Sequence, residues 1–341
     1  MVFLRKDNDM TVFVVCPAFH KTGGTELAHQ LVFELNKIDV SAIITYYDYE
    51  KYKDPINEEF RQYVKSYETI DNIIDSEENF ILVPEINFAL LNNYSNIRKG
   101  IWWMSVDNYL KNDGFINGFR TVGFINALKA VLGKRNTLFA RGFDKNVLHF
   151  YQSEYAHQFL INEGVKESNI SKLSDYVNDL YLEKRTDTKK NKVVLYNPKK
   201  GYDFTKKLIN KSSGIKWIAI ENLTTQQVKE LLSESMVYID FGNHPGKDRF
   251  PREAAISGCC IITGLNGSAK YYEDIPIPDD YKFEKKESNI SAILDKVTDC
   301  LENYDSNFEK FATYRNMIRN EHSVFCKDVK AFVKRIGVQY K

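Results

Sequence analysis

The 341-residue sequence has no long apolar run and only five cysteines. No segment approaches the roughly 18 uninterrupted apolar residues of a membrane-spanning helix, and residues 1–10 lack the apolar stretch of a signal peptide. We therefore expect a cytoplasmic protein, with attachment to the inner face of a membrane left open. The cysteines form no CxxC pair, and we expect them to be buried, reduced thiols.

The sequence also lacks an excess of charge of either sign. Its 47 basic and 46 acidic residues give a net charge of +1, whereas a strongly basic chain would indicate a nucleic-acid partner. We expect no nucleic-acid partner, so a charged ligand must be met by a local cluster of side chains. The composition, 43% apolar and 27% charged, is typical of a globular protein, and 341 residues favour two domains.

The second half of the chain alternates strand-like apolar runs with helical segments. The apolar runs are residues 192–197, 215–220, 236–241 and 259–263. Between them, Thr224 and Gln227 form the capping box of an amphipathic helix. This alternation predicts a parallel sheet with helices on both faces.

The first half repeats this alternation less clearly. Its expected strands are residues 11–16, 40–46, 80–84, 100–106 and 147–152. Helices are expected over 25–37 and from Ser153 to about Gly164. Trp102 and Trp103 are adjacent on one strand, so one ring should enter the core and the other could stack on a sugar.

The predicted architecture is α/β, with two Rossmann-like, doubly wound domains facing a cleft. We assign residues 1–177 to the first domain and 178–310 to the second, with a polar linker near their junction. A C-terminal helix over 311–341 is expected to pack back on the first domain. Ligands of such sheets bind at the carboxyl ends of the strands.

The most informative segment is a charged loop between two apolar strands, "GNHPGKDRFPREAAISGCC" at 242–260. Pro251 is suited to the first turn of a helix, where free N–H groups and the helix dipole attract anions. Glu253 would lie in that turn and could accept hydrogen bonds from two sugar hydroxyls. The cations of the loop are His244, Lys247, Arg249 and Arg252. Together these groups suit a nucleoside diphosphate; the alternative is a solvated loop whose charges pair with one another.

Two further strand ends carry similar groups. Lys199 and Lys200 precede Gly201 at the end of the 192–197 run, where the alternative is an ordinary lysine-rich turn. Gly23 and Gly24 lie between the first strand and its helix, where glycine lets the backbone approach a ligand. On their own, these two glycines are better explained by a plain tight turn.

Taken together, these segments resemble the GT-B glycosyltransferases, specifically the family-4 or group 1 type of surface-polysaccharide biosynthesis. The resemblance covers most of the chain. It rests on "GGTELAHQLVFEL", "YQSEYAHQFLINEGV", "SDYVND", "LYNPKKG" and, most specifically, "REAAISGCCIITG".

The resemblance implies a role for each matched residue. Glu253 matches the second glutamate of the family's E-x7-E motif, which binds the nucleotide ribose, and the lysine pair after Asn197 would neutralise the diphosphate. Gly23 and Gly24 would lie beside the donor, as would Gly267 and Ser268 of "GLNGSA". Pro245 stands where the family has its first glutamate, so His244, Lys247 or Asp248 would have to replace that group.

The implied reaction is transfer of a sugar from a nucleotide-diphosphate donor to a glycan or lipid-linked acceptor, with retention of configuration. Lys199, Lys200 and Lys247, with Arg249, could stabilise the leaving group without metal, and no permanently bound cofactor is expected. The only clear Asp-x-Asp motif, Asp7 and Asp9, lies in a polar stretch outside any expected core strand. The sequence therefore does not favour a metal-dependent glycosyltransferase of the GT-A type.

Three features of the first half bear on the acceptor. Asp107 and Glu85 follow strands and could serve the acceptor, or could cap helices or have another structural role. The basic, apolar segment 114–143 could rest on anionic lipid, or could form core helices with basic outer faces. The main alternative function is a non-catalytic GT-B-like partner of an active enzyme, favoured by the missing glutamate; an epimerase or phosphorylase ranks lower.

Overall fold

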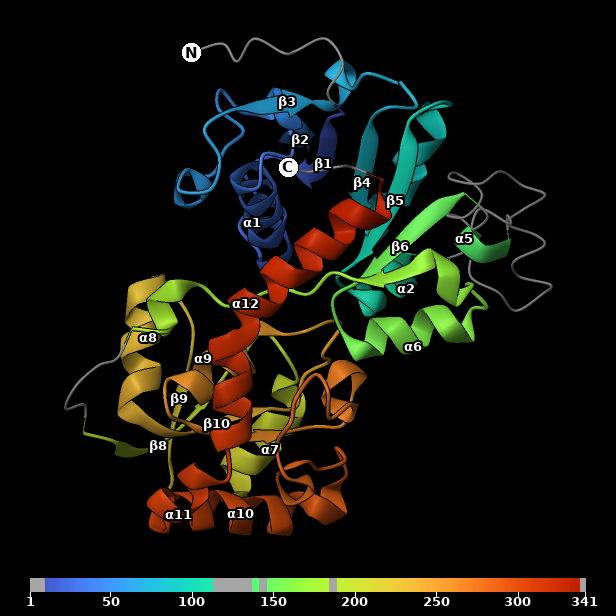
Figure 1. The fold of residues 1–341 in the computed structure, drawn as a ribbon. Coiled ribbons are helices and arrows are strands. Elements are labelled where there is room, and N and C mark those ends of the chain that lie inside the picture. The colour runs from blue at the N-terminus through green and yellow to red at the C-terminus, as the bar shows by residue number, and fades with distance from the viewer. Residues whose placement is uncertain (1–9, 113–136, 141–145, 184–188, 338–341) are drawn as a thin grey trace. The chain divides into compact units, whose positions relative to one another are not determined.

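The computed structural model describes residues 10–112, 137–140, 146–183 and 189–337, and the chain divides into two units (Figure 1). The first comprises Met1–Gln152, Ala156–Asp175 and Ser323–Lys341. The second comprises Ser153–Tyr155 and Tyr176–His322. The predicted domain boundaries are 177/178 and 310/311. In the structure, the chain passes from the first unit to the second at 175/176 and returns to the first at 322/323, inside the last helix.

The first unit contains a seven-stranded sheet in the order β3-β2-β1-β4-β5-β6-β7, with every neighbouring pair parallel. Its strands are β1 Val12–Pro17, β2 Ala42–Tyr47, β3 Tyr67–Thr69, β4 Phe80–Pro84, β5 Arg98–Trp103, β6 Val147–Tyr151 and β7 Ile170–Lys172. Strands β1 and β4 are buried along almost their whole length, as expected for parallel strands covered on both faces. The five predicted strands are confirmed, and β3 and β7 are additional.

Helix α1 packs on β1 and β2 through Leu27, Leu31 and Leu35, which are fully buried as their spacing predicted. Helix α1 spans Gly23–Lys37, and the other helices among the described residues up to 175 are α2 Val106–Asn112, α5 Thr137–Ala140 and α6 Glu154–Asn162. The 3-10 helices described in the same range are η1 Tyr49–Lys51, η2 Glu58–Phe60, η3 Ile70–Asn72, η4 Glu85–Asn93 and η6 Glu167–Asn169.

The two tryptophans of β5 are both buried, so the expectation that one ring is free to stack on a sugar is wrong. Trp102 donates its indole N–H to the Leu173 carbonyl, and Trp103 donates to His149 Nδ1. Their rings do point to opposite faces of the strand, but helices and loops cover both faces of this sheet.

The second unit contains a four-stranded parallel sheet in the order β11-β10-β8-β9. Its strands are β8 Asn191–Tyr196, β9 Lys216–Ala219, β10 Ser235–Asp240 and β11 Cys260–Thr263. Its helices are α7 Tyr202–Lys211, α8 Thr225–Glu234, α9 Arg249–Ile256, α10 Ile290–Glu302 and α11 Tyr304–Glu309, and α12 Ala312–Arg335 begins here. The 3-10 helices are η7 Asp179–Tyr181, η8 Gly267–Lys270, η9 Asp279–Tyr281 and η10 Glu287–Asn289.

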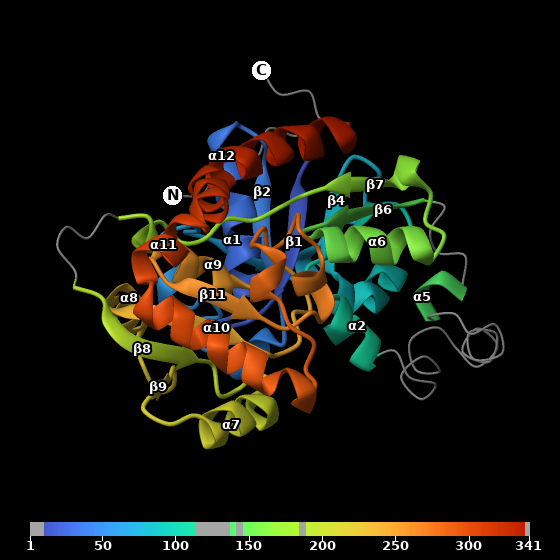
Figure 2. The same ribbon diagram turned by 90° about the horizontal axis from the view of Figure 1, so that it is seen from below.

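The helices surround this sheet (Figure 2): α10 packs on β8 and β10, and α9 packs on β10 and β11. The predicted capping box of α8 is present, with Thr224 N–H donating to Gln227 Oε1 and Gln227 N–H donating to Thr224 Oγ1. All five cysteines are free, as predicted, and four are buried; Cys326 is only half-buried, so the prediction of burial is wrong for it. The predicted pair of parallel, doubly wound α/β sheets is confirmed.

The observed start of helix α9 differs from the predicted one, and this difference affects the site. Helix α9 begins at Arg249, not at Pro251, so Pro251 is its third residue and Glu253 lies in the second turn. Proline is tolerated there because the first-turn N–H groups have no intrahelical partner. No helix among the described residues is long and apolar enough to cross a membrane.

Candidate functional site

Two loops at the carboxyl edge of the second sheet are in direct backbone contact. Gly201, after β8, has φ +63°, and a Cβ there would lie 2.3 Å from the Phe241 carbonyl oxygen. Gly242, after β10, has Lys200 Cβ only 2.6 Å from the position of a Cβ. The glycines therefore allow the 197–201 turn to lie against the start of the charged loop.

The loop after β11 supports the same charged loop from its other side. Gly267 has φ +58°, and a Cβ there would lie 2.0 Å from the His244 carbonyl oxygen. Ser268 N–H donates to this carbonyl at 2.9 Å, and Ser268 Oγ donates to the Gly246 carbonyl at 2.7 Å. These two residues, predicted to lie beside the donor, fix the backbone of residues 244–246.

Four charged side chains meet where these loops pack. Lys200 Nζ lies 3.0 and 2.9 Å from the two carboxylate oxygens of Asp248. His244 lies between two carboxylates, with Nδ1 3.2 Å from Asp248 Oδ2 and Nε2 3.7 Å from Asp240 Oδ1. The chain of contacts thus runs from Lys200 through Asp248 and His244 to Asp240.

Burial and neighbouring charge oppose each other in this cluster. Burial alone would lower the pKa of His244, but the carboxylates of Asp240 and Asp248 outweigh it, and the pKa is raised from its ordinary value. Burial would raise the pKa of Asp248, but His244 and Lys200 outweigh it and the pKa is lowered. Both shifts favour the charged forms, and each ring nitrogen of His244 faces a carboxylate oxygen.

Asp240, His244 and Asp248 are also residue types that bind metals, and their ligand atoms lie within 4.8 Å of one another. The nearest oxygens of the two carboxylates contact different ring nitrogens, Asp248 Oδ2 at 3.2 Å from Nδ1 and Asp240 Oδ1 at 3.7 Å from Nε2. Lys200 already supplies a cation to Asp248. This geometry fits a chain of ion pairs better than a chelate.

Two of the predicted ligand-binding cations face inward. Arg252 is fully buried, and its Nη1 donates to Glu321 Oε2 at 2.9 Å. Lys247 Nζ lies 2.8 Å from Glu321 Oε1. Arg252 also donates to the carbonyls of Lys247 and Asp248. Both cations therefore tie the charged loop to α12.

The remaining predicted residues of the second unit differ in exposure. Lys199 is exposed, and its N–H donates to Asn197 Oδ1 at 2.9 Å, which shapes the turn after β8. Arg249 is half-buried at the start of α9, and Glu253 is buried in the second turn. The structure thus places the paired lysines, the charged loop and the 264–269 loop at one sheet edge.

The predicted residues of the first unit lie at the carboxyl edge of the other sheet. Gly23 and Gly24 are the first two residues of α1, behind the N-cap Thr22, and so belong to the helix rather than to a separate loop. Asp107 is the second residue of α2 and is half-buried. Of segment 114–143, only residues 137–140 are described, and Asp7 and Asp9 lie outside the described residues.

Glu85 is the most perturbed carboxyl group at this edge. It is 2% exposed, and its Oε2 accepts a hydrogen bond from Met104 N–H at 3.0 Å. Burial raises its pKa to about 7, although the backbone hydrogen bonds act in the opposite direction. It joins the ends of β4 and β5, which is the structural alternative that the sequence left open.

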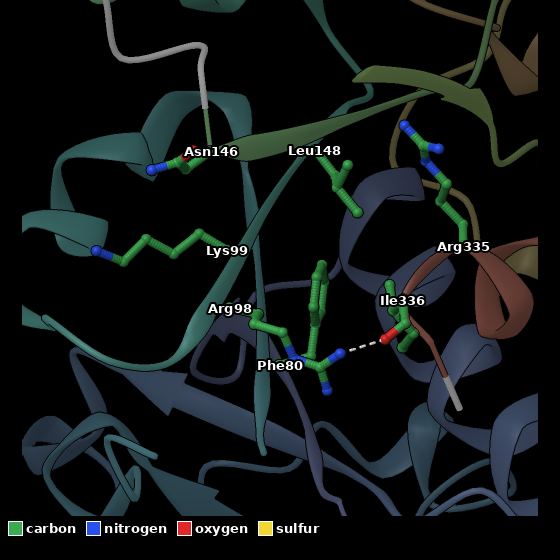
Figure 3. A pocket seen from close by; sticks show the side chains of 7 residues that line it. All are labelled: Phe80, Arg98, Lys99, Asn146, Leu148, Arg335 and Ile336. Atoms are coloured by element: carbon green, nitrogen blue, oxygen red, sulfur yellow. Dashed lines mark hydrogen bonds between the residues drawn. The ribbon is translucent and has the colours of Figure 1, made fainter. Parts of the chain in front are cut away.

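A cavity of about 150 Å³ opens at the opposite edge of the first sheet (Figure 3). It is lined by Phe80, Arg98, Lys99, Asn146, Leu148, Arg335 and Ile336. Phe80 and Arg98 are the first residues of their strands. Because ligands of doubly wound sheets bind at the carboxyl ends of the strands, this cavity is not a candidate for the donor site.

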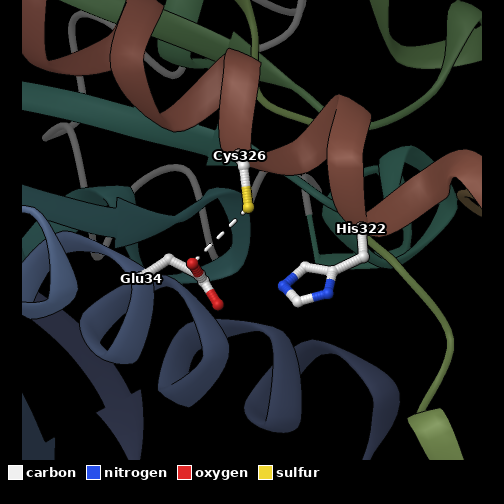
Figure 4. Close-up of side chains that lie close together, drawn as sticks. All are labelled: Glu34, His322 and Cys326. Atoms are coloured by element: carbon white, nitrogen blue, oxygen red, sulfur yellow. Dashed lines mark hydrogen bonds between the residues drawn. The ribbon is translucent and has the colours of Figure 1, made fainter.

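Figure 4 draws Glu34 and Cys326 of the first unit and His322 of the second, and each of them has a partner within its own unit. In the first unit, Cys326 Sγ lies 3.5 Å from Glu34 Oε2, and Lys37 Nζ binds the same carboxylate. In the second unit, His322 stacks on Tyr176 with ring centroids 4.3 Å apart.

Sequence reasoning missed Asp240 and Glu321. Asp240 ends β10, and a carboxylate at the carboxyl end of an otherwise apolar strand was a visible signal. Glu321 lies on α12, 69 residues from Arg252, and no local pattern links the two.

The fold is shared with solved glycosyltransferases. Anabaena HepE in complex with UDP-glucose has 9% identity and a TM-score of 0.66, over 95% of this chain and 99% of that one. A glycosyltransferase from Rickettsia africae has 13% identity and a TM-score of 0.63, over 97% and 100%. An alpha-glucosyltransferase in complex with UDP and a 13-mer DNA has 10% identity and a TM-score of 0.53, over 97% and 100%.

No protein-family model and no curated protein matches the chain. The structural similarities confirm the predicted GT-B fold, while the closer resemblance to family 4 stays a prediction.

Proposed function

We propose that the protein is a glycosyltransferase that moves a sugar from a nucleoside-diphosphate donor to a glycan or lipid-linked acceptor. The observation that carries the proposal is the Lys199–Lys200 turn, held by glycine contacts against the charged loop at the carboxyl edge of the second sheet. That edge is where doubly wound sheets bind ligands. The fold, shared with proteins solved with UDP or UDP-glucose, supports a nucleotide donor.

The lysines are the groups best placed to meet a diphosphate. Lys199 is exposed, and the side chain of Lys200 is 35% exposed. As the bond between the sugar and the diphosphate breaks, negative charge grows on the leaving phosphate, and preset cations stabilise it there. Arg249 adds a further positive charge at the start of α9, while Glu253 is our candidate for the ribose hydroxyls.

The transfer breaks the anomeric C–O bond to the diphosphate and forms a new C–O bond to the acceptor, whose hydroxyl proton must leave. In the retaining reaction we propose, the departing phosphate takes that proton. An inverting reaction would need a base, for which Asp107 is the candidate. We propose that neither reaction requires a metal, because Lys199 and Lys200 supply the positive charge.

The acceptor is the least constrained part of the proposal. We propose that segment 114–143 meets a lipid-linked acceptor at an anionic membrane surface, on the basis of its basic, apolar composition. One structurally similar glucosyltransferase was solved with DNA. The expectation of no nucleic-acid partner therefore has no support from the comparisons, and DNA belongs among the acceptors to be assayed.

The donor site is tested by thermal shift with a panel of nucleoside diphosphates and nucleotide sugars. A ligand at ~100 times its dissociation constant should stabilise the protein by about 2.7 kcal/mol. We expect one base to stabilise the wild type, with the shift lost in Glu253→Ala and in Lys199→Ala/Lys200→Ala. Lys206→Ala removes an exposed lysine of the same unit and should keep the full shift.

A folded protein that no nucleotide stabilises would overturn the proposal and favour a non-catalytic partner of an active enzyme. The specific observation behind that second candidate is Pro245, which stands eight residues before Glu253 where the family has its first glutamate. Slow hydrolysis of the donor without acceptor, absent in the double lysine variant, would instead establish catalysis.

A further inference from the structure

His244 is a fully buried histidine that lies between two carboxylates. Its side chain is 0% exposed, and neither ring nitrogen has hydrogen-bond geometry to a described residue. Its contacts are instead the charged ones to Asp248 and Asp240, at 3.2 and 3.7 Å. An imidazole in such a position is a counter-charge for its neighbours rather than a surface group.

Lys200 is bound to a carboxylate of the protein itself. Both Asp248 oxygens lie within 3.0 Å of Nζ, and an ammonium has only three donors. Although Asp248 is the N-cap residue of α9, its side chain makes no capping hydrogen bond there and faces Lys200 and His244 instead. Asp248 thus takes up to two of the three donors, and a phosphate that draws Lys200 fully to itself must compete with Asp248.

That competition would be costly if Lys200 were the only partner of Asp248. The Asp248 side chain is 15% exposed, and a carboxylate left unpaired at that burial loses much of its solvation without compensation. His244 offers a second partner, fully buried and with Nδ1 3.2 Å from Asp248 Oδ2. Asp240, in turn, accepts hydrogen bonds from the Tyr238 hydroxyl at 3.0 Å and from Gly242 N–H at 2.8 Å.

We propose that His244 is a positioning residue for the anion site, and that it shares Asp248 with Lys200 so that Lys200 can turn to a diphosphate while Asp248 keeps a partner. Asp248 is then an internal competitor of the ligand, and His244 weakens its hold on Lys200. This inference rests on the proposed function, because it gives Lys200 an anionic ligand.

The geometry predicts opposite effects for two neighbouring substitutions. Asp248→Asn keeps the shape but removes the competing charge, so affinity for UDP and for inorganic pyrophosphate should rise roughly three- to tenfold. His244→Gln leaves Asp248 to Lys200 alone and removes a positive charge, so affinity should fall by a similar factor. A merely structural role for both residues would lower affinity in both variants.

The experiment is isothermal titration of the full chain with UDP and with pyrophosphate. The proteins are the wild type, both single variants, their double variant, and each single variant combined with Lys200→Ala. We expect the His244→Gln effect to vanish in the Asp248→Asn background, and both effects to shrink when Lys200 is absent. Melting temperatures are measured alongside, so that loss of fold is not taken for loss of affinity.

Weaker binding by a folded Asp248→Asn variant would overturn the inference, as would equal effects with and without Lys200. Even if His244→Gln fails to fold, the inference is tested by whether Asp248→Asn raises or lowers the affinity for UDP and pyrophosphate. A wild type that binds neither UDP nor pyrophosphate would overturn the proposed function together with this inference. Binding by the wild type with the wrong pattern among the variants would overturn the inference alone.

Discussion

Replacing Glu321 by glutamine should destabilise the second unit strongly. The carboxylate of Glu321 is 3% exposed and serves Arg252 at 2.9 Å and Lys247 at 2.8 Å. It also accepts a hydrogen bond from Val177 N–H at 3.3 Å. Glutamine keeps the volume and one acceptor oxygen, but it removes the negative charge that Glu321 supplies to two cations, 0% and 10% exposed.

The size of the effect follows from burial. Removing one partner of a buried ion pair costs about 3–5 kcal/mol, because the remaining charge has neither solvent nor partner. Here one anion serves two cations, although Arg252 keeps its hydrogen bonds to the carbonyls of Lys247 and Asp248. We therefore expect about 3 kcal/mol, which lowers the melting temperature of a domain of this size by roughly 6–12 °C.

The measurement is thermal unfolding of Glu321→Gln followed by circular dichroism. The matched control is Glu287→Gln, which breaks the exposed Lys207–Glu287 pair, with side chains 50% and 69% exposed. Exposed pairs contribute about 1 kcal/mol or less, so the control should remain close to the wild type. A Glu321→Gln variant as stable as the control would refute the structural role of Arg252 and Lys247. Both cations would then again be candidates for binding the ligand.

Three further predictions are independent of that pair. Gly267→Ala should destabilise the protein and weaken UDP binding, because the new Cβ would meet the His244 carbonyl; Gly214→Ala, also at positive φ but in open space, should cost about 1 kcal/mol from backbone strain alone. Burial raises the pKa of Glu85 from 4.5 to about 7, so the folded state holds its proton more tightly and stability falls as pH rises through that window. Glu85→Gln should therefore gain up to about 3 kcal/mol over the wild type at pH 8 and lose the gain near pH 4.5, and a pH-independent gain in chemical denaturation would contradict this. Stabilisation by UDP should be the same in EDTA as in magnesium or manganese, and a requirement for either cation would contradict metal-independent binding.

The strands were predictable because parallel strands covered on both faces appear as continuous apolar runs. β1 and β10 are of this kind, and their predicted and observed limits agree within a residue. β3 and β7 were missed because each has only three residues and a largely exposed or half-buried pattern, which carries no apolar signal.

The candidate site was predictable only as a location. Strand ends and glycines placed Lys199, Lys200 and the charged loop at one sheet edge, and the structure brings them together there. The direction of each side chain was not predictable, because it depends on distant partners. Arg252 faces Glu321, which follows it by 69 residues, and Lys200 meets Asp248 across 48 residues.

The charged loop therefore carries two sets of charges with different tasks. Lys247 and Arg252 bind it to α12, while Asp248 contacts both Lys200 and His244 at the sheet edge. Asp248 places a negative charge three residues after Pro245, and Lys200 pairs with that charge. Of residues 244–248, His244 is fully buried and the remaining charged side chains are ion-paired. A side-chain acceptor for the hydroxyls of the donor sugar must accordingly come from outside this segment, and a variant at Pro245 that adds a glutamate should test whether the loop can hold one.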